Sequence, residues 1–272
     1  SGTFVDIINR EIFGCEIEIE QGVIKEIKRR DTADGPFIMP GFIDSHVHIE
    51  SSMLIPSQFA KMALKQGTIA VVTDPHEVAN VAGIEGVRFM MNNALKVPLK
   101  FYFGVPSCVP ASPLEKSGAE LKAKDVEKLI LENGFHFLAE MMNFPGVVNG
   151  DSEVLAKLRA AKQAGKRVDG HAPGLSGVSL KKYAQAGITT DHECSTVEEA
   201  IEKINLGMKI LIREGSAAKN LVNLLPIIQN HPEYVMFCTD DCHPDYLKDG
   251  HINKIVARAI EMGYDLFDVL KA

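Results

Sequence analysis

Hydrophobic and polar residues alternate along this chain of 272 residues with two different periods. In residues 3–30 the alternation has a period of two, in three short runs at 4–8, 15–20 and 23–28. This pattern predicts β-strands with one buried face, and Gln21-Gly22 is a turn signal that predicts a hairpin. We expect residues 1–36 to form the N-terminal part of a small β domain, a β-sandwich-like segment.

From residue 37 onward, β-rich apolar runs alternate with amphipathic stretches. Eight apolar runs predict strands, at 37–46, 68–75, 99–106, 136–142, 167–172, 188–193, 209–214 and 234–240. Alternating strands and helices predict a parallel sheet. Eight such units in about 230 residues fit a closed (β/α)8 barrel of the TIM type over 37–272. A doubly wound open sheet is the alternative architecture.

The stretches between these runs predict helices. The clearest amphipathic stretches lie at 56–66, 78–94, 152–164 and 216–229. Several helices are expected to end at a glycine in the left-handed conformation, just before the next strand. These glycines are Gly67, Gly134, Gly165, Gly187 and Gly207.

The composition argues against several classes of protein. With 29 basic and 36 acidic residues, the net charge of −7 argues against a nucleic-acid or anionic-membrane partner. No apolar run approaches the roughly 20 residues of a membrane span, and no signal-peptide pattern opens the sequence. The five cysteines are odd in number and widely spaced, which predicts reduced thiols in a cytoplasmic protein. Cys238 and Cys242 are interpreted as small buried hydrophobic residues.

Histidines and carboxylates lie at the ends of the predicted strands, where barrels of this type place their functional groups. His46 and His48 are two positions apart, so their side chains point to the same side of a strand. A glutamate in an apolar strand is costly to bury unless it is paired or bound to a metal. Each residue alone reads as a structural hydrogen-bonding group, but coincidence explains the set poorly. The set is His46, His48, Glu140, His171, His192 and Asp240.

Nitrogen and oxygen ligands of this kind can hold two divalent ions when one carboxylate bridges them. We assign His46, His48 and Asp240 to one ion, the two later histidines to the other, and Glu140 to the bridge. Imidazole and carboxylate suit zinc, manganese or iron. Such a pair lowers the pKa of a shared water, and Asp240 can carry its proton to a leaving group. The set therefore indicates metal-assisted hydrolysis.

Three stretches resemble the motifs of one enzyme family. Residues 40–52 read Pro-Gly-Phe-Ile-Asp-Ser-His-Val-His-Ile-Glu-Ser-Ser, residues 73–77 read Thr-Asp-Pro-His-Glu, and residues 239–245 read Thr-Asp-Asp-Cys-His-Pro-Asp. With these motifs the chain resembles the amidohydrolase superfamily, and within it the adenine deaminases. The resemblance covers nearly the entire chain. Many relatives bridge their metals with a carbamylated lysine, and here Glu140 stands in that place.

The resemblance implies hydrolytic deamination of adenine to hypoxanthine and ammonia with two divalent ions per subunit, manganese or iron before zinc. Glu140 and the proposed ligand Asp240 would be catalytic. The purine ring must gain a proton, and His76, Glu77 and Glu193 are candidates for the acid. We place His76 among the catalytic residues and the two glutamates with the substrate contacts. Asp241 is a further candidate contact to the purine, with a loop cap or a partner for a ligand histidine as the alternative.

Two other functions stay open at this point. One is another cyclic-amide hydrolase or deacetylase of the superfamily, and the other is a catalytically silent metal-binding barrel. Arg213-Glu214 is read as an ion pair at the barrel mouth, with a substrate contact as the alternative. The expected partners are a small-molecule purine and further copies of the chain in a homo-oligomer, in cytoplasmic purine salvage. Family members continue past the eighth strand, so their C-terminal region is expected to be absent from this chain.

Overall fold

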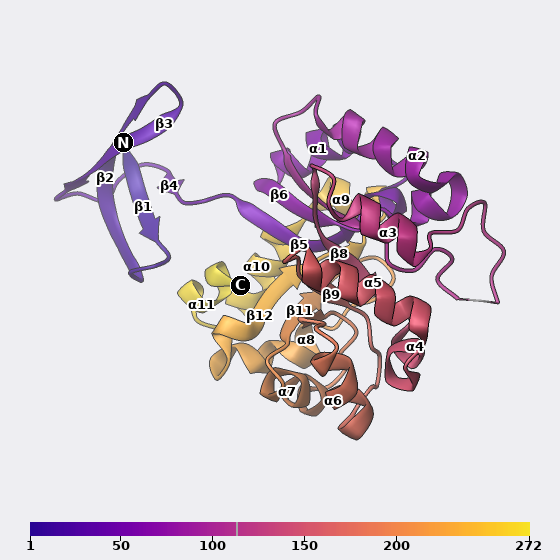
Figure 1. Cartoon of the computed structure of the whole chain (residues 1–272). Coiled ribbons are helices and arrows are strands. Elements are labelled where there is room, and N and C mark those ends of the chain that lie inside the picture. The colour runs from indigo at the N-terminus through magenta and orange to yellow at the C-terminus, as the bar shows by residue number, and fades with distance from the viewer. Residues whose placement is uncertain (113) are drawn as a thin grey trace.

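The computed structural model describes residues 1–112 and 114–272. Its N-terminal strands form a separate small sheet, which an extended linker joins to the rest of the chain (Figure 1). Among the described residues this sheet has the order β3-β2-β1-β4, from β1 (Gly2–Asp6), β2 (Glu11–Glu20), β3 (Val23–Arg30) and β4 (Phe37–Ile38). Gln21 and Gly22 have φ values of 52° and 80°, as the hairpin turn between β2 and β3 requires. The predicted hairpin is confirmed.

One expectation for this sheet is wrong. The period of two predicted one buried face, but every residue of β3 is exposed, and Ile19, Val23 and Ile24 are 65%, 67% and 55% exposed. Within the described part of the chain, no second layer covers β3. Arg10 ties the sheet to the last helix through ion pairs of 2.7 Å to Asp265 and 2.5 Å to Asp268.

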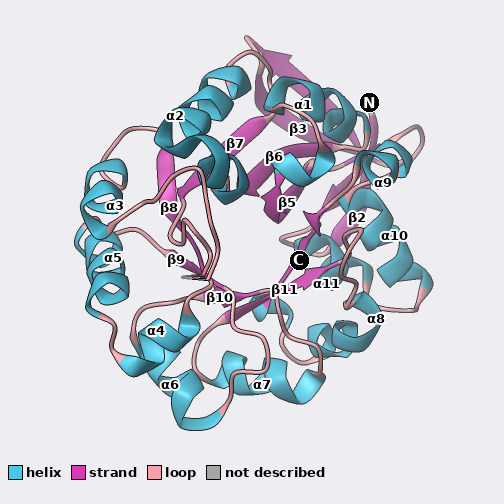
Figure 2. Ribbon diagram, turned by 90° about the vertical axis from the view of Figure 1, so that its right-hand side faces the viewer, coloured by secondary structure: helices cyan, strands magenta, loops and turns pink. Residues whose placement is uncertain are grey.

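Parallel strands form the predicted barrel, around which the helices lie in a ring (Figure 2). One sheet of the described chain has the order β13-β5-β6-β7-β8-β9, and another has the order β10-β11-β12. The bridge between Val168 and Ile188 joins β9 to the segment before β10. β13 follows β12 directly and pairs with β5. The open doubly wound sheet is therefore excluded. The strands are β5 (Phe42–His48), β6 (Thr68–Thr73), β7 (Lys100–Val105), β8 (Phe135–Met141), β9 (Val168–Gly170), β10 (Thr190–Asp191), β11 (Lys209–Arg213), β12 (Val235–Cys238) and β13 (Asp240–Asp241).

The predicted strands at the two ends of the barrel differ from the observed ones. The run 37–46 is divided around Pro40, so that β4 joins the N-terminal sheet and β5 begins the barrel and extends to His48. The run 234–240 is interrupted at Thr239, because Asp240 has a left-handed backbone with φ of 56°. Such a conformation is strained in a residue other than glycine and is typical of functional sites.

The helices confirm most of the predicted stretches, and all five predicted glycines have positive φ values between 66° and 103°. The stretch 216–229 is wrong in its first part. The residues before Asn220 form a loop. The side chain of Asn220 accepts a hydrogen bond from the N–H of Arg213 at 2.8 Å. The helices are η1 (Ile49–Ser52), α1 (Pro56–Lys65), α2 (His76–Ala94), α3 (Ala123–Leu129), α4 (Phe144–Asn149), α5 (Ser152–Gln163), α6 (Gly177–Gln185), α7 (Val197–Asn205), α8 (Leu221–Leu224), η2 (Leu225–Gln229), η3 (Pro232–Tyr234), α9 (Pro244–Asp249), α10 (Ile252–Glu261) and α11 (Leu266–Lys271).

The remaining expectations from composition concern membranes and cysteines. Among the described helices, none combines the length and the apolar character that a membrane span requires. All five cysteines are free thiols and are buried, including Cys238 and Cys242. The interpretation of these two as small buried hydrophobic residues is confirmed.

Candidate active site

The six predicted ligands come together at the carboxyl ends of the barrel strands. His46 and His48 end β5, Glu140 lies near the end of β8, and Asp240 opens β13. The other two histidines follow β9 and β10. Since parallel strands end at the same edge, residues far apart in the sequence meet there. Five of the six are at most 6% exposed, and the side chain of His171 is 27% exposed.

Two groups of ligand atoms can be distinguished. In the first, Nε2 of His46 lies 3.1 Å from Nε2 of His48, and Oδ1 of Asp240 lies 3.2 Å from the same His48 atom. In the second, Oε2 of Glu140 lies 2.8 Å from Nδ1 of His171 and 3.2 Å from Nε2 of His192. The other Glu140 oxygen, Oε1, is 3.4 Å from Nε2 of His48, so this carboxylate reaches both groups.

The ring nitrogens of β5 that face away from the site are held by the protein. Nδ1 of His46 contacts Oδ2 of Asp169 at 2.7 Å, and Nδ1 of His48 contacts the carbonyl of Asp74 at 3.0 Å. Such contacts fix the orientation of a ligand ring and leave Nε2 free for a metal. Two imidazole nitrogens 3.1 Å apart beside a carboxylate are a donor set that a divalent cation satisfies. The clusters therefore fit metal binding.

The charges of these groups depend strongly on one another. Burial opposes a charge on His48, but its hydrogen bond to Asp240 and the charge of Glu140 outweigh burial and raise its pKa to about 10. Burial likewise opposes a charge on His192, and Glu140 raises its pKa to about 9. Burial opposes ionisation of Glu140 and Asp240, but the histidines hold both pKa values below the usual range.

Metal binding to the metal-free protein is expected to release protons at pH 8. His48 and His192 have pKa values of about 10 and about 9, so both are charged at that pH and must lose a proton to bind a metal. We expect these two histidines to release about two protons per chain, and a metal affinity that weakens as the pH falls. Calorimetric Mn²⁺ titrations in two buffers of different ionisation enthalpy measure this number. Equal heats in both buffers would contradict the raised pKa values.

His76 and Glu77 lie beside this centre at the start of α2. Nδ1 of His76 is 3.1 Å from Oδ2 of Asp74, and its Nε2 is 3.2 Å from Oε1 of Glu77. The Glu77 side chain is 54% exposed, whereas that of His76 is 8% exposed. Burial opposes ionisation of Glu77, but the hydrogen bond from His76 is the larger effect and lowers its pKa. Glu77 therefore contacts His76, which in turn lies 3.5 Å from Oε1 of Glu140.

Arg213 connects two carboxylates at the barrel mouth. It donates to both oxygens of Glu193, at 2.5 and 2.9 Å, and to Oδ2 of Asp240 at 2.7 Å. The predicted ion pair at the mouth is confirmed, but its partner is not the neighbouring residue, because Glu214 pairs with Arg258. Asp241 accepts a hydrogen bond from the hydroxyl of Ser51.

Comparison with known proteins identifies the family. The model of the amidohydrolase family matches residues 37–272. The chain belongs to the amidohydrolase family. It is 54% identical over 271 residues to adenine deaminase from Methanosarcina mazei, covering 99% of this chain and 49% of that protein. It is 55% identical over 268 residues to adenine deaminase from a Sulfurovum species, covering 98% and 50%. The chain thus spans about half the length of the curated relatives it matches.

Solved structures of other enzymes share the fold of this amidohydrolase. N-acetyl-D-glucosamine-6-phosphate deacetylase from Mycobacterium smegmatis has a TM-score of 0.66 at 14% identity, covering 99% of this chain and 84% of that one. D-hydantoinase from a Thermus species has a TM-score of 0.65 at 15% identity, covering 100% and 78%. At such identities the likeness concerns the fold alone.

Two buried groups that support the amidohydrolase site were missed by the sequence reading. Asp191 and Lys203 are both fully buried, and Nζ of Lys203 lies 2.8 Å from Oδ2 of Asp191. The other Asp191 oxygen accepts from the N–H of Ala172, and Lys203 also donates to the carbonyl of Ala172 at 2.9 Å. This pair ties together the loops that carry His171 and His192. The signal in the sequence was the acidic residue directly before His192.

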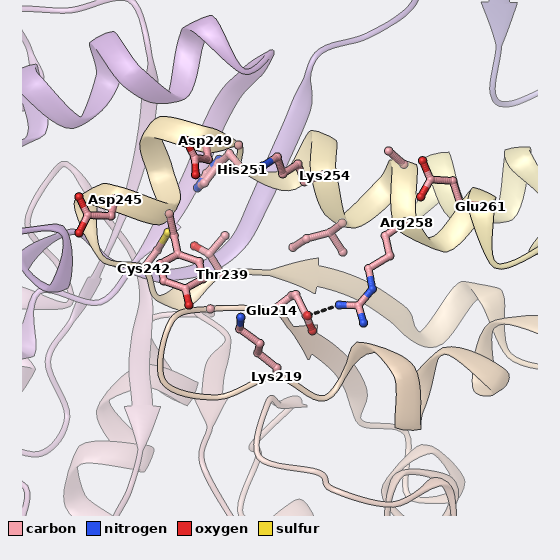
Figure 3. Close-up of a pocket in the computed structure, with 15 residues that line it drawn as sticks. Glu214, Lys219, Thr239, Cys242, Asp245, Asp249, His251, Lys254, Arg258 and Glu261 are labelled. Atoms are coloured by element: carbon pink, nitrogen blue, oxygen red, sulfur yellow. Dashed lines mark hydrogen bonds and ion pairs between the residues drawn. The ribbon is translucent and has the colours of Figure 1, made fainter.

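A cavity of about 580 Å³ in this amidohydrolase is lined by residues such as Glu214, His251 and Arg258 (Figure 3). Its described lining comes from the loop after β11, from β12–β13 and from α9 and α10, and includes none of the six ligands. His251 lies in this lining and contacts Asp44 at 3.0 Å. Asp44 in turn accepts from the N–H groups of Thr239 and His46. The cavity wall therefore supports the strand ends that carry the ligands.

Proposed function

We propose that this chain is the catalytic part of an adenine deaminase, which converts adenine and water to hypoxanthine and ammonia. The observation that carries the proposal is the identity of 54–55% to adenine deaminases over nearly the whole chain. The convergence of the six predicted ligands supports it, because hydrolysis of this kind needs a metal-activated water.

Two divalent ions per subunit are the proposed cofactors. His46, His48 and Asp240 would hold one, His171 and His192 the other, and Glu140 would bridge them. When bound, such ions supply Lewis acidity and a water of lowered pKa. The mixed imidazole and carboxylate ligands suit manganese or iron best, with zinc as a further possibility.

The residues of the chain move the protons. Asp240 would take a proton from the attacking water and deliver it to the exocyclic amine, while a C6–O bond forms and the C6–N bond breaks. The ring nitrogen beside C6 also gains a proton and keeps it in hypoxanthine, and the second proton of the water, lost from the C6 oxygen as it becomes the carbonyl, returns to the group that supplied the ring proton. We assign the ring proton to the His76–Glu77 pair, which is supported by the contact of 3.2 Å between the two side chains.

Glu193 and Asp241 are the proposed contacts to the purine edge. Glu193 is supported by its two hydrogen bonds from Arg213, which fix the direction of its carboxylate. Asp241 is only partly buried and follows the proposed ligand Asp240, so it lies at the mouth of the site.

The proposal includes the organisation of the whole protein. Residues 1–36 would be the first part of a small β domain, and residues 37–272 the hydrolase barrel. The exposed apolar side chains of β3 support a further layer against this sheet. We also propose a homo-oligomer in the cytoplasm, and the free cysteine thiols support that location.

Adenine turnover tests this function. The chain is loaded in turn with Mn²⁺, Fe²⁺ and Zn²⁺, and hypoxanthine is followed by ultraviolet absorbance together with ammonia release. We expect turnover that requires metal, with Mn²⁺ or Fe²⁺ more active than Zn²⁺. A chimera in which residues 1–272 replace the matching half of the Methanosarcina mazei enzyme is measured in parallel. A fully metal-loaded chimera without turnover would contradict the proposal.

A further inference from the structure

A third group of buried ligand atoms lies beside the six ligands, at the end of β6. It consists of one atom each from His48, Asp74, His76 and Glu140, and these atoms all lie within 4.8 Å of one another. Nδ1 of His76 is 3.1 Å from Oδ2 of Asp74 and 3.5 Å from Oε1 of Glu140. The proposed function uses neither Asp74 nor the Nδ1 atom of His76.

These two side chains are buried without hydrogen bonds at the atoms that face each other. Asp74 is 1% exposed and His76 is 6% exposed. Among the described residues, neither Oδ2 of Asp74 nor Nδ1 of His76 has a partner in hydrogen-bonding geometry. A separation of 3.1 Å is instead close to the roughly 3 Å between adjacent ligands around an ion with bonds of about 2.1 Å.

The balance of charge also favours a cation. Two other buried carboxylates of the site have a lysine or arginine partner, since Lys203 pairs with Asp191 and Arg213 with Asp240. Within the described chain, no lysine or arginine pairs with Asp74, whose charged neighbour is His76. A buried carboxylate without a cation is costly, and a bound divalent ion would remove that cost.

We propose that Asp74, His76 and Oε1 of Glu140 form a third divalent-cation site in this chain. The site rests on the proposed function in one respect, because Glu140 is shared with the two-ion centre. His48 remains a ligand of that centre, since its Nδ1 is bonded to the carbonyl of Asp74. Two carboxylate oxygens and one imidazole suit Mn²⁺, Fe²⁺ or Mg²⁺.

A bound ion would position the start of α2. With Nδ1 of His76 on the ion, its Nε2–H donates to Oε1 of Glu77 across the observed 3.2 Å. The bound ion would thereby fix the direction of the Glu77 carboxylate beside the site. His76 acts through Glu77 in this arrangement and is a positioning residue.

The metal content of the Mn²⁺-loaded chain tests this site. Free metal is removed by gel filtration, and manganese per chain is measured by plasma mass spectrometry. We expect three ions in the unchanged chain and two in Asp74→Asn and in His76→Gln. The matched control Glu77→Gln changes a neighbouring carboxylate outside the cluster and is expected to keep three. Circular dichroism checks folding, and His76→Gln decides the result if Asp74→Asn does not fold.

The outcomes separate this proposal from the proposed function. Two ions in the unchanged chain and in both variants would overturn the third site and leave the two-ion centre intact. Two ions that fall to one in Asp74→Asn would overturn both, because Asp74 would then bind one of the two. Fewer than two ions in the unchanged chain would also overturn both.

Discussion

Replacing Asp240 with asparagine is expected to reduce adenine turnover by about 10²- to 10⁴-fold, because the variant cannot accept the proton of the attacking water. Most of the metal should remain bound. The amide oxygen can still accept from Arg213, and the other ligands of both groups are unchanged. The measurement is kcat for hypoxanthine formation together with metal per chain. It is made on the chain itself, or on the chimera with the Methanosarcina mazei enzyme if only the chimera shows turnover.

Asp245→Asn is the matched control for this variant. Asp245 lies in the same motif but is exposed on α9, and its replacement is expected to leave kcat within about twofold. If Asp240→Asn kept full turnover with the metal still bound, Asp240 would not be the proton carrier. If it lost the metal, the carboxylate would act chiefly as a ligand.

Replacing Lys203 with methionine is expected to lower the free energy of unfolding by about 3–5 kcal/mol, because Asp191 would be left as a buried charge without its cation. Both side chains are fully buried, so water does not screen the pair. The histidines after β9 and β10 should also bind metal more weakly, because the Ala172 carbonyl loses its donor. Urea unfolding and calorimetric metal titration measure the two effects.

Further variants test whether the broken ion pair with Asp191 causes the loss of stability in Lys203→Met. Lys182→Met changes an exposed lysine on α6 and is expected to alter stability by less than about 0.5 kcal/mol. Asp191→Asn combined with Lys203→Met removes both charges and should restore part of the lost stability. If the double variant were as unstable as the sum of Lys203→Met and Asp191→Asn, each measured alone, the two residues would act independently.

The barrel could be predicted because each of its strand–helix units has its own signal in the local sequence. Apolar runs, amphipathic stretches and terminal glycines alternate along the sequence, and each depends on neighbours only a few residues away. The six ligands could be predicted for the same reason, since parallel strands bring their ends to one edge. The prediction that His46 and His48 point to the same side required only the two-residue period of a strand.

Strand lengths depended on contacts that the local pattern does not contain. β9 and β10 are shorter than their apolar runs, and the chain after Gly170 and Asp191 turns into the loops that carry the site. The left-handed backbone of Asp240 ended the last predicted strand early. The period of two in β3 predicted a buried face, but burial requires a covering layer, which a local pattern does not supply.

The sequence by itself therefore determined the fold class, the order of the units and the six candidate ligands. The tertiary structure alone decided which charges pair: Arg213 with Glu193 and Asp240, Asp169 with His46, and Lys203 with Asp191. It also placed Asp74 and His76 against Glu140. The physical reason is that a strand or helix follows from short-range periodicity, whereas the partner of a buried charge is fixed by packing between segments far apart in the chain.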